Sequence, residues 1–153
     1  TRLIDMGIEP YLISSSVVAV IAQRLLRVIC PQCKQPYTPN GREISLWGQG
    51  GESATIAGQL YKGVGCENCI QTGYMGRTGI SELLTIDDDI KELISKRQGS
   101  HIIKGAAVQK GMATLREDGL RKALAGETTL EEVCRVTQDY VQTDRGLTER
   151  VGG

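Results

Sequence analysis

Two Cys-x-x-Cys pairs, "CPQC" at Cys30 to Cys33 and "CENC" at Cys66 to Cys69, constrain this chain more than any other feature of its sequence. Each pair can fold into a tight turn that presents two sulfur atoms to one ion. Two such turns complete a tetrahedral shell of four thiolates, which favours Zn²⁺. Because no ligand position then stays open, the ion is expected to be structural and not catalytic. The pattern therefore predicts a zinc site made by Cys30, Cys33, Cys66 and Cys69.

Two other uses of the cysteines compete with zinc binding. A disulfide framework is the weaker one, because five cysteines in a chain without a secretory leader indicate a reducing compartment. A redox pair would ordinarily stand alone at a helix N-terminus, where the helix dipole lowers the thiol pKa. Cys30 is expected instead at the C-terminal end of a helix. Cys134 lies on an amphipathic segment and is expected to be a buried core thiol rather than a fifth ligand.

The two pairs lie farther apart than is usual for a zinc element. Cys33 and Cys66 are separated by 32 residues, against a usual span of about 15 to 20. The intervening segment 36–58 is rich in Gly, Ser, Pro and Asn, so it is expected to be mostly loop, with a short helix near Arg42 to Trp47. Short strands are predicted at Leu60 to Lys62 and at Gly79 to Leu84.

The segment before the first pair is predicted to be largely helical. We expect the end of one helix, a break at Gly7, a turn at Pro10 and a short strand from Tyr11 to Ile13. A second helix, capped by the serines of 14–16, is expected to run to about Ile29. It would be apolar nearly all round, so it should be buried against a larger neighbouring domain. Together with the missing initiator Met, this predicts a fragment of a longer protein.

From Thr85 onward the chain is predicted to be helical. Helix caps are expected at Thr85, Ser100, Thr114 and Thr129, each followed by apolar residues at helical spacing. Gly119 lies inside one of these helices at a cost of roughly 1 kcal/mol, which indicates close packing there. The acidic run 87–89 is explained by the helix dipole, and His101, the only histidine, is expected to be a surface residue.

The sequence gives little support for functions other than metal binding. The chain carries 18 basic and 18 acidic residues and no Phe, which argues against binding nucleic acid by charge or by base stacking. It has no P-loop, Rossmann, H-E-x-x-H or G-x-S-x-G motif. The stretch "GYMGRTG", 73–79, is expected to be a loop with Arg77 at its tip. Arg77 is either a solvated side chain or a contact for an anion or a subunit, because guanidinium suits phosphate and carboxylate.

Four stretches, in order, resemble one family: "TRLIDMGIEPYLISSS", "AQRLLRVICPQC", "CENCIQTGYMGRTGISELL" and "TLREDGLRKALAGETTLEEV". They are similar to the C-terminal part of the type II secretion traffic ATPases, with the type IV pilus assembly ATPases as close relatives. The resemblance extends to about Asp139. It implies an α+β, mostly helical chain in which the family's zinc ligands fall on Cys30, Cys33, Cys66 and Cys69. Arg77 would lie near the nucleotide or a subunit interface.

The resemblance also implies a division of the chain and a parent protein. The parent would be a hexameric ATPase at the cytoplasmic face of the inner membrane, using ATP and Mg²⁺ to drive pseudopilus assembly. Its partners would be neighbouring subunits and inner-membrane platform proteins, with peripheral membrane association through them. Because the Walker motifs are absent here, this chain alone is not expected to hydrolyse ATP. A free-standing tetracysteine zinc module that binds nucleic acid or protein is the alternative.

The parts of the chain expected from the resemblance are the end of a RecA-like core (1–29), the tetracysteine element (30–84), a helical subdomain (85–143) and a flexible tail (144–153).

Overall fold

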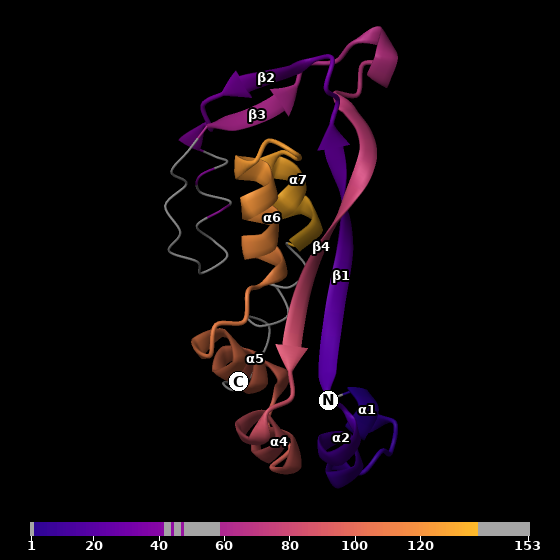
Figure 1. Ribbon diagram of the computed structural model, residues 1–153, viewed down its shortest axis with the longest axis vertical. Coiled ribbons are helices and arrows are strands. Elements are labelled where there is room, and N and C mark those ends of the chain that lie inside the picture. Colours follow the sequence, from indigo (N-terminus) through magenta and orange to yellow (C-terminus); the bar gives the residue numbers. More distant parts are fainter. Residues whose placement is uncertain (1, 42–43, 45–46, 48–58, 138–153) are drawn as a thin grey trace, which may run out of the picture. The chain divides into compact units, whose positions relative to one another are not determined.

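The computed structural model of the chain describes residues 2–41, 44, 47 and 59–137. The described chain contains helices and two small antiparallel sheets, one pairing β1 with β4 and one pairing β2 with β3 (Figure 1). This is the expected α+β arrangement. The elements, in chain order, are α1 (Arg2–Asp5), α2 (Pro10–Ser16), β1 (Ala19–Ile29), β2 (Lys34–Tyr37), β3 (Leu60–Gly63), the 3-10 turn η1 (Glu67–Cys69), β4 (Tyr74–Thr85), α4 (Asp88–Ser95), α5 (Ser100–Gln109), α6 (Leu115–Leu124) and α7 (Leu130–Thr137).

The chain forms two compact units. Unit 1 comprises Thr1–Ala22 and Ser81–Thr114, and unit 2 comprises Gln23–Ile80 and Leu115–Gly153. Each long strand, β1 and β4, contributes residues to both units. Among the described residues, no helix is both long and apolar enough to cross a membrane.

Unit 1 consists mainly of helices that pack around aliphatic side chains. Helix α4 contacts both α2 and α5, and the side chain of Asp87 accepts a hydrogen bond from the amide of Ile90 to cap α4. Lys110 forms ion pairs with Asp87, at 2.7 Å, and with Asp89. The acidic run therefore caps a helix and holds a lysine, as its position in the first turn predicts. The buried core of the unit consists of Ile86, Ile90, Ile94 and Ala107.

Unit 2 combines the β2–β3 ribbon with two packed helices. The ribbon is antiparallel, with Lys34 opposite Gly63 and Tyr37 opposite Leu60, and β3 contacts α6. Helix α6 packs on α7 so closely that a Cβ placed on Gly119 would lie 2.5 Å from Cγ1 of Val133. The expectation that close packing requires Gly119 is thus confirmed.

The predicted helix over 14–29 is wrong, because these residues form the end of α2 and then strand β1. The run is rich in β-branched Val and Ile, which favour a pleated strand over a helix. Tyr11 to Ile13 lie in α2 and not in a strand, because Pro10 occupies the first helical turn, where proline is well tolerated. Most of β1 is exposed in this chain and only Leu26 and Ile29 are buried, so the expected burial against a larger neighbouring domain stays a prediction.

The predicted loop at 73–79 is wrong as well. Strand β4 begins at Tyr74 and absorbs both this stretch and the shorter strand expected at Gly79 to Leu84. Gly76 lies inside β4 with φ +79°, a left-handed conformation that glycine adopts readily. The strand predicted at Leu60 to Lys62 is confirmed as β3.

The helices predicted after the cysteines are confirmed, with small shifts at their starts. Asp87, not Thr85, caps α4, and Ser100 is the first residue of α5 rather than its cap. Thr129 Oγ1 accepts a hydrogen bond from the amide of Glu132 at 3.1 Å, as its predicted cap role requires. The loop and short helix expected between 36 and 58 lie largely outside the described residues, although Trp47 is described and is buried.

Candidate metal centre

The four cysteines predicted to bind zinc lie together, with all four sulfur atoms within 4.8 Å of one another. The sulfur of Cys66 is 3.8 Å from that of Cys30 and 3.7 Å from that of Cys69, and Cys33 lies 3.9 Å from Cys69. A tetrahedral site with Zn–S bonds of about 2.3 Å has sulfur–sulfur edges of about 3.8 Å. The spacing of the sulfurs therefore fits one tetrahedral ion.

The β2–β3 ribbon explains how cysteines so far apart in the sequence come together. Cys33 directly precedes β2, and Cys66 follows three residues after β3 ends. The amide of Val64 donates to the carbonyl of Cys33 at 3.1 Å, which closes the ribbon at its base. The chain thus leaves the first cysteine pair along β2 and returns to the second pair along the neighbouring strand β3. The length of the segment between the strands therefore does not separate the cysteines.

Hydrogen bonds from backbone amides support the second pair. Cys69 Sγ accepts from the amides of Cys66, at 3.3 Å, and Gly73, at 3.2 Å. Ile70, directly after the turn η1, has a left-handed φ of +52°, and its amide donates to the carbonyl of Glu67. Amide donors directed at sulfur stabilise a thiolate, which is the form that binds a metal.

The thiols of the cluster differ strongly in acidity. Burial raises the pKa of Cys69, but the amides of Cys66 and Gly73 and the neighbouring thiols outweigh it, so this pKa falls to about 6. Burial raises the pKa of Cys33 to about 11, and the neighbouring sulfurs of Cys69, Cys30 and Cys66 add to the rise. Four thiolates this close repel one another, so a cation is needed to hold all of them in the charged form.

A Zn²⁺ ion with four thiolates would carry about two negative charges. Three cations near the cluster in sequence face aromatic rings instead of sulfur. The Lys34 ammonium lies 4.4 Å from the Tyr61 ring centre, and the Arg27 guanidinium lies 4.1 Å from that of Tyr74. Lys62 lies over the ring of Tyr37 in the same way.

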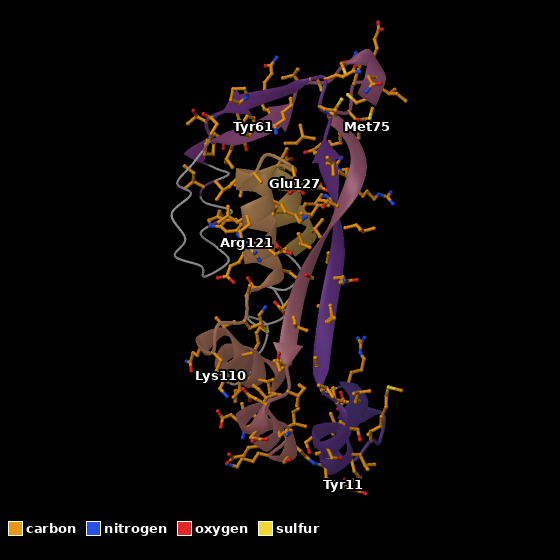
Figure 2. All side chains as sticks on the ribbon, viewed as in Figure 1. Tyr11, Tyr61, Met75, Lys110, Arg121 and Glu127 are labelled. Carbon is orange, nitrogen blue, oxygen red and sulfur yellow. The ribbon has the colours of Figure 1, made fainter. Side chains whose placement is uncertain are left out.

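A side-chain amide also reaches the cluster. Asn68 Nδ2 lies 3.9 Å from Cys30 Sγ and 3.6 Å from the sulfur of Met75. Figure 2 shows Met75 at the start of β4, at the same end of unit 2 as the β2–β3 ribbon. Among the described residues, the polar contacts to the sulfurs thus come from backbone amides and one asparagine.

The other residues singled out in the sequence do not join the cluster. Arg77 is exposed on β4 and forms no ion pair within the part of the chain that the structure describes. Cys134 is buried in α7, as expected for a core thiol, and is not among the four clustered cysteines. His101 is exposed on α5, in agreement with its predicted surface position.

Sequence reasoning missed a second charged cluster, built around Glu132. This side chain is fully buried and accepts hydrogen bonds from the guanidinium groups of Arg27, at 2.8 Å, and Arg135, at 2.7 and 2.9 Å. Burial alone would raise the pKa of Glu132, but the two arginines hold it down at about 2. Glu132 and Arg135 are three apart on a helix, which gave a local signal. Nothing local pointed to Arg27.

Comparison with known proteins identifies the family. The family described as "Type II/IV secretion system protein" matches residues 1–135. The chain belongs to this family. Its relatives include the Type II secretion system protein E of Pseudomonas aeruginosa, 46% identical over 139 residues, and the Type II secretion system ATPase E of Vibrio cholerae, 45% identical over 139 residues. The Type IV pilus assembly ATPase PilB of Thermus thermophilus is 48% identical over 133 residues.

The family match confirms the resemblance found in the sequence motifs. It also allows the length of this secretion-family chain to be compared with the lengths of its relatives. The alignments cover 91% of the chain but 27% of each of the two type II proteins, and 87% of the chain but 15% of PilB. The chain therefore spans about a quarter or less of the length of these relatives, and it carries the four-cysteine cluster within that part.

Proposed function

We propose that the chain is the C-terminal structural and interaction region of a hexameric ATPase that powers type II protein secretion, and that it holds one structural Zn²⁺. The observation that supports the zinc most strongly is the set of sulfur distances of 3.7 to 3.9 Å. The match of residues 1–135 to the secretion family supports the parent activity. Type IV pilus assembly is the second candidate, because PilB is as similar to the chain as the type II proteins are.

In this proposal Cys30, Cys33, Cys66 and Cys69 bind the metal, whose contribution is to cross-link the chain, since four thiolates leave no position for a substrate. The backbone amides of Cys66 and Gly73 hold Cys69 Sγ in the charged form. The β2–β3 ribbon then fixes the distance between the two pairs. Each of these roles is structural, and the thiols release their protons when the metal binds.

The proposed division of the chain is that expected from the sequence. Residues 1–29 would end a RecA-like ATPase core, 30–84 would form the tetracysteine element and 85–143 the helical subdomain, while the tail expected at 144–153 lies outside the described residues. The exposed apolar side chains of β1, among them Val20, Ile21 and Leu25, support the first assignment. Such side chains suit a strand that packs against further parts of a larger protein.

The remaining proposals concern the whole parent protein. Arg77 would contact the nucleotide or a neighbouring subunit, because its guanidinium is exposed on a strand and has no acidic partner among the described residues. The parent would bind ATP and Mg²⁺ through segments outside this chain. It would assemble as a hexameric ring and meet the inner membrane from the cytoplasm, through secretion platform proteins and not through nucleic acid.

Native mass spectrometry under reducing conditions tests the metal. We expect one Zn²⁺ in the wild-type chain, one in Cys134→Ser, and none in Cys66→Ser. Cys134→Ser is the matched control, because it removes a buried thiol outside the cluster. A folded wild-type chain without metal would contradict the zinc proposal.

Steady-state ATP hydrolysis by the full-length secretion ATPase tests Arg77. We expect Arg77→Ala to lower the rate at least tenfold while zinc content stays at one per subunit. Arg121→Ala serves as the control, because Arg121 is an exposed arginine whose only described ion pair is with Asp118, three residues earlier on α6. Equal rates for the two variants would remove Arg77 from the proposal.

A further inference from the structure

Gly73 connects the two cysteine pairs through its backbone. Its amide donates to Cys69 Sγ at 3.2 Å, and its carbonyl accepts from the amide of Cys30 at 2.9 Å. One residue therefore fixes the sulfur of the second pair and the main chain of the first. Cys30 and Cys69 are the first and last of the four cysteines, so this contact joins the two ends of the metal-binding segment.

The contact depends on a second glycine, Gly63, at the end of β3. A Cβ placed on Gly73 would lie 2.5 Å from the carbonyl oxygen of Gly63, and a Cβ on Gly63 would lie closer still to the carbonyl oxygen of Gly73. Distances below 3.0 Å between a Cβ and backbone require the backbone to shift. Neither position can accept a side chain while the two strands keep this separation.

The close approach of the Gly63 and Gly73 backbones, called the Gly63–Gly73 crossing below, is distinct from the ordinary use of glycine in a left-handed turn. Gly73 has φ +75°, so a side chain there would be strained by the backbone as well as by Gly63. Gly63 lacks a positive φ, so crowding alone excludes a side chain. Gly76 has φ +79°, and a Cβ placed on it would meet no atom within 4 Å, so strain alone acts there. The chain thus offers three glycines that separate the two effects.

We propose that the Gly63–Gly73 crossing sets the metal affinity of the cysteine cluster, with Gly73 as a positioning residue that acts through its backbone. The inference rests on the proposed zinc site. A side chain on either glycine moves β3 away from the start of β4, and this movement breaks the bonds from Gly73 to Cys30 and Cys69. The four sulfurs then lose the spacing that fits one tetrahedral ion.

Zinc affinity of the whole chain, measured by competition with a chromophoric chelator, tests the proposal with Gly63→Ala, Gly73→Ala and the control Gly76→Ala. Loss of contacts that orient metal ligands typically weakens binding about 10- to 100-fold. We expect Gly63→Ala and Gly73→Ala to weaken zinc binding at least tenfold, and Gly76→Ala to weaken it less than threefold. Co²⁺ substitution should show weaker tetrahedral d–d absorption in the first two variants only.

The outcomes separate this inference from the proposed function. A wild-type chain that binds no zinc overturns the zinc site itself. A wild-type chain that binds zinc, with Gly63→Ala within threefold of it, overturns the crossing. An equal loss of zinc affinity in Gly63→Ala and Gly76→Ala also overturns the role of the crossing, because crowding between the two backbones would then not be the cause of the loss.

A measurement on the wild-type chain avoids the risk that a variant fails to fold. In the chain loaded with ¹¹³Cd²⁺, the amide of Gly73 should show a scalar coupling to the metal through its hydrogen bond to Cys69 Sγ. The amide of Gly76, three residues away in β4, should show none. Absence of the coupling at Gly73 would show that its amide does not hold the sulfur.

Discussion

The core of unit 1 and the cysteine end of unit 2 are stabilised in different ways. Ile86, Ile90 and Ile94 pack with Ala107 in unit 1, and further aliphatic side chains surround them. At the cysteine end, Cys30, Cys33 and Cys69 form the buried cluster, and Cys66 is the partly buried side chain that packs against it among the described residues. Burial of apolar area thus holds the first region, whereas the proposed zinc site would hold the second through four thiolates and a cation.

Because of this difference, the two regions should lose stability under different treatments. Each buried aliphatic side chain contributes about 1.5 to 3 kcal/mol through its removal from water, and no cofactor is needed. Four clustered thiolates contribute favourably only when a cation compensates their charge. Reagents that act on metal should therefore affect unit 2 first.

Removal of zinc should have the largest effect. Structural zinc sites contribute apparent free energies of about 10 to 16 kcal/mol at pH 7, so the β2–β3 ribbon should open when the metal is chelated. Hydrogen exchange should show loss of protection at Leu60–Gly63 and little change in α4. The Cys134→Ser variant with zinc bound should keep both. Equal loss in the two regions would contradict the comparison.

Substitution of Glu132 by Gln should destabilise unit 2 by up to about 3 kcal/mol, because the neutral amide loses the charge-assisted hydrogen bonds to two half-exposed arginines. Glu131, its exposed neighbour on the same helix, provides the control, and Glu131→Gln should change stability by less than about 0.5 kcal/mol, the order expected for surface changes. Denaturant unfolding, monitored by exchange at α7, measures both. Similar values for the two variants would show that the cluster contributes little.

The same glutamate should give unit 2 a pH dependence. Its pKa is lowered from 4.5 to about 2 in the folded state, so the unfolded chain binds the proton more readily. The stabilisation from Glu132 is therefore fully present above pH 4.5 and is lost as the pH falls from 4.5 towards 2. The stability difference between wild type and Glu132→Gln should shrink over that interval, while metal loss affects both chains alike.

Truncation of the buried Ile90 to Ala should destabilise unit 1 by about 3 kcal/mol, through lost burial and a cavity. Zinc affinity should not change. Ile21, which is 61% exposed and also lies in unit 1, is the matched control, and Ile21→Ala should change stability by less than about 1 kcal/mol. Thermal unfolding together with chelator competition distinguishes the two variants. A change of zinc affinity in Ile90→Ala would mean that the regions do not respond separately.

The smallest expected effects come from the same substitution made once in each unit. Gly119→Ala should destabilise by about 1 to 2 kcal/mol, because the added methyl meets Val133. Gly105, in α5, has open space around it, so Gly105→Ala should stabilise by about 0.5 to 1 kcal/mol through helix propensity. Opposite signs in chemical denaturation would confirm this difference, and equal signs would contradict it.

The sequence predicted the features that rest on short, specific patterns. Cysteine spacing predicted the four-sulfur cluster, because few arrangements bring two Cys-x-x-Cys pairs to one ion. Capping residues and apolar periodicity predicted α4 to α7, since both signals are local in the chain. Gly126, two residues after the end of α6, has φ +72°, as is common for glycine beyond a helix C-terminus.

The errors came where the deciding contacts are distant in sequence. The Val- and Ile-rich run of β1 is compatible with a buried helix or a strand, and pairing with the distant strand β4 decides between them. Glu132 contacts Arg27 across 105 positions, which no local pattern encodes. The Gly63–Gly73 crossing joins two glycines ten positions apart, whose close approach no local pattern indicates.

The order of the cysteines has a mechanical consequence. With zinc bound, a pulling force that enters through Ile29 and leaves through Tyr74 passes from Cys30 to the metal and on to Cys69. Residues 31–68 then carry no tension, so roughly 130 Å of chain, at about 3.4 Å per residue, stays hidden until the metal leaves. In a single-molecule stretching experiment this length should appear only after a chelator is added.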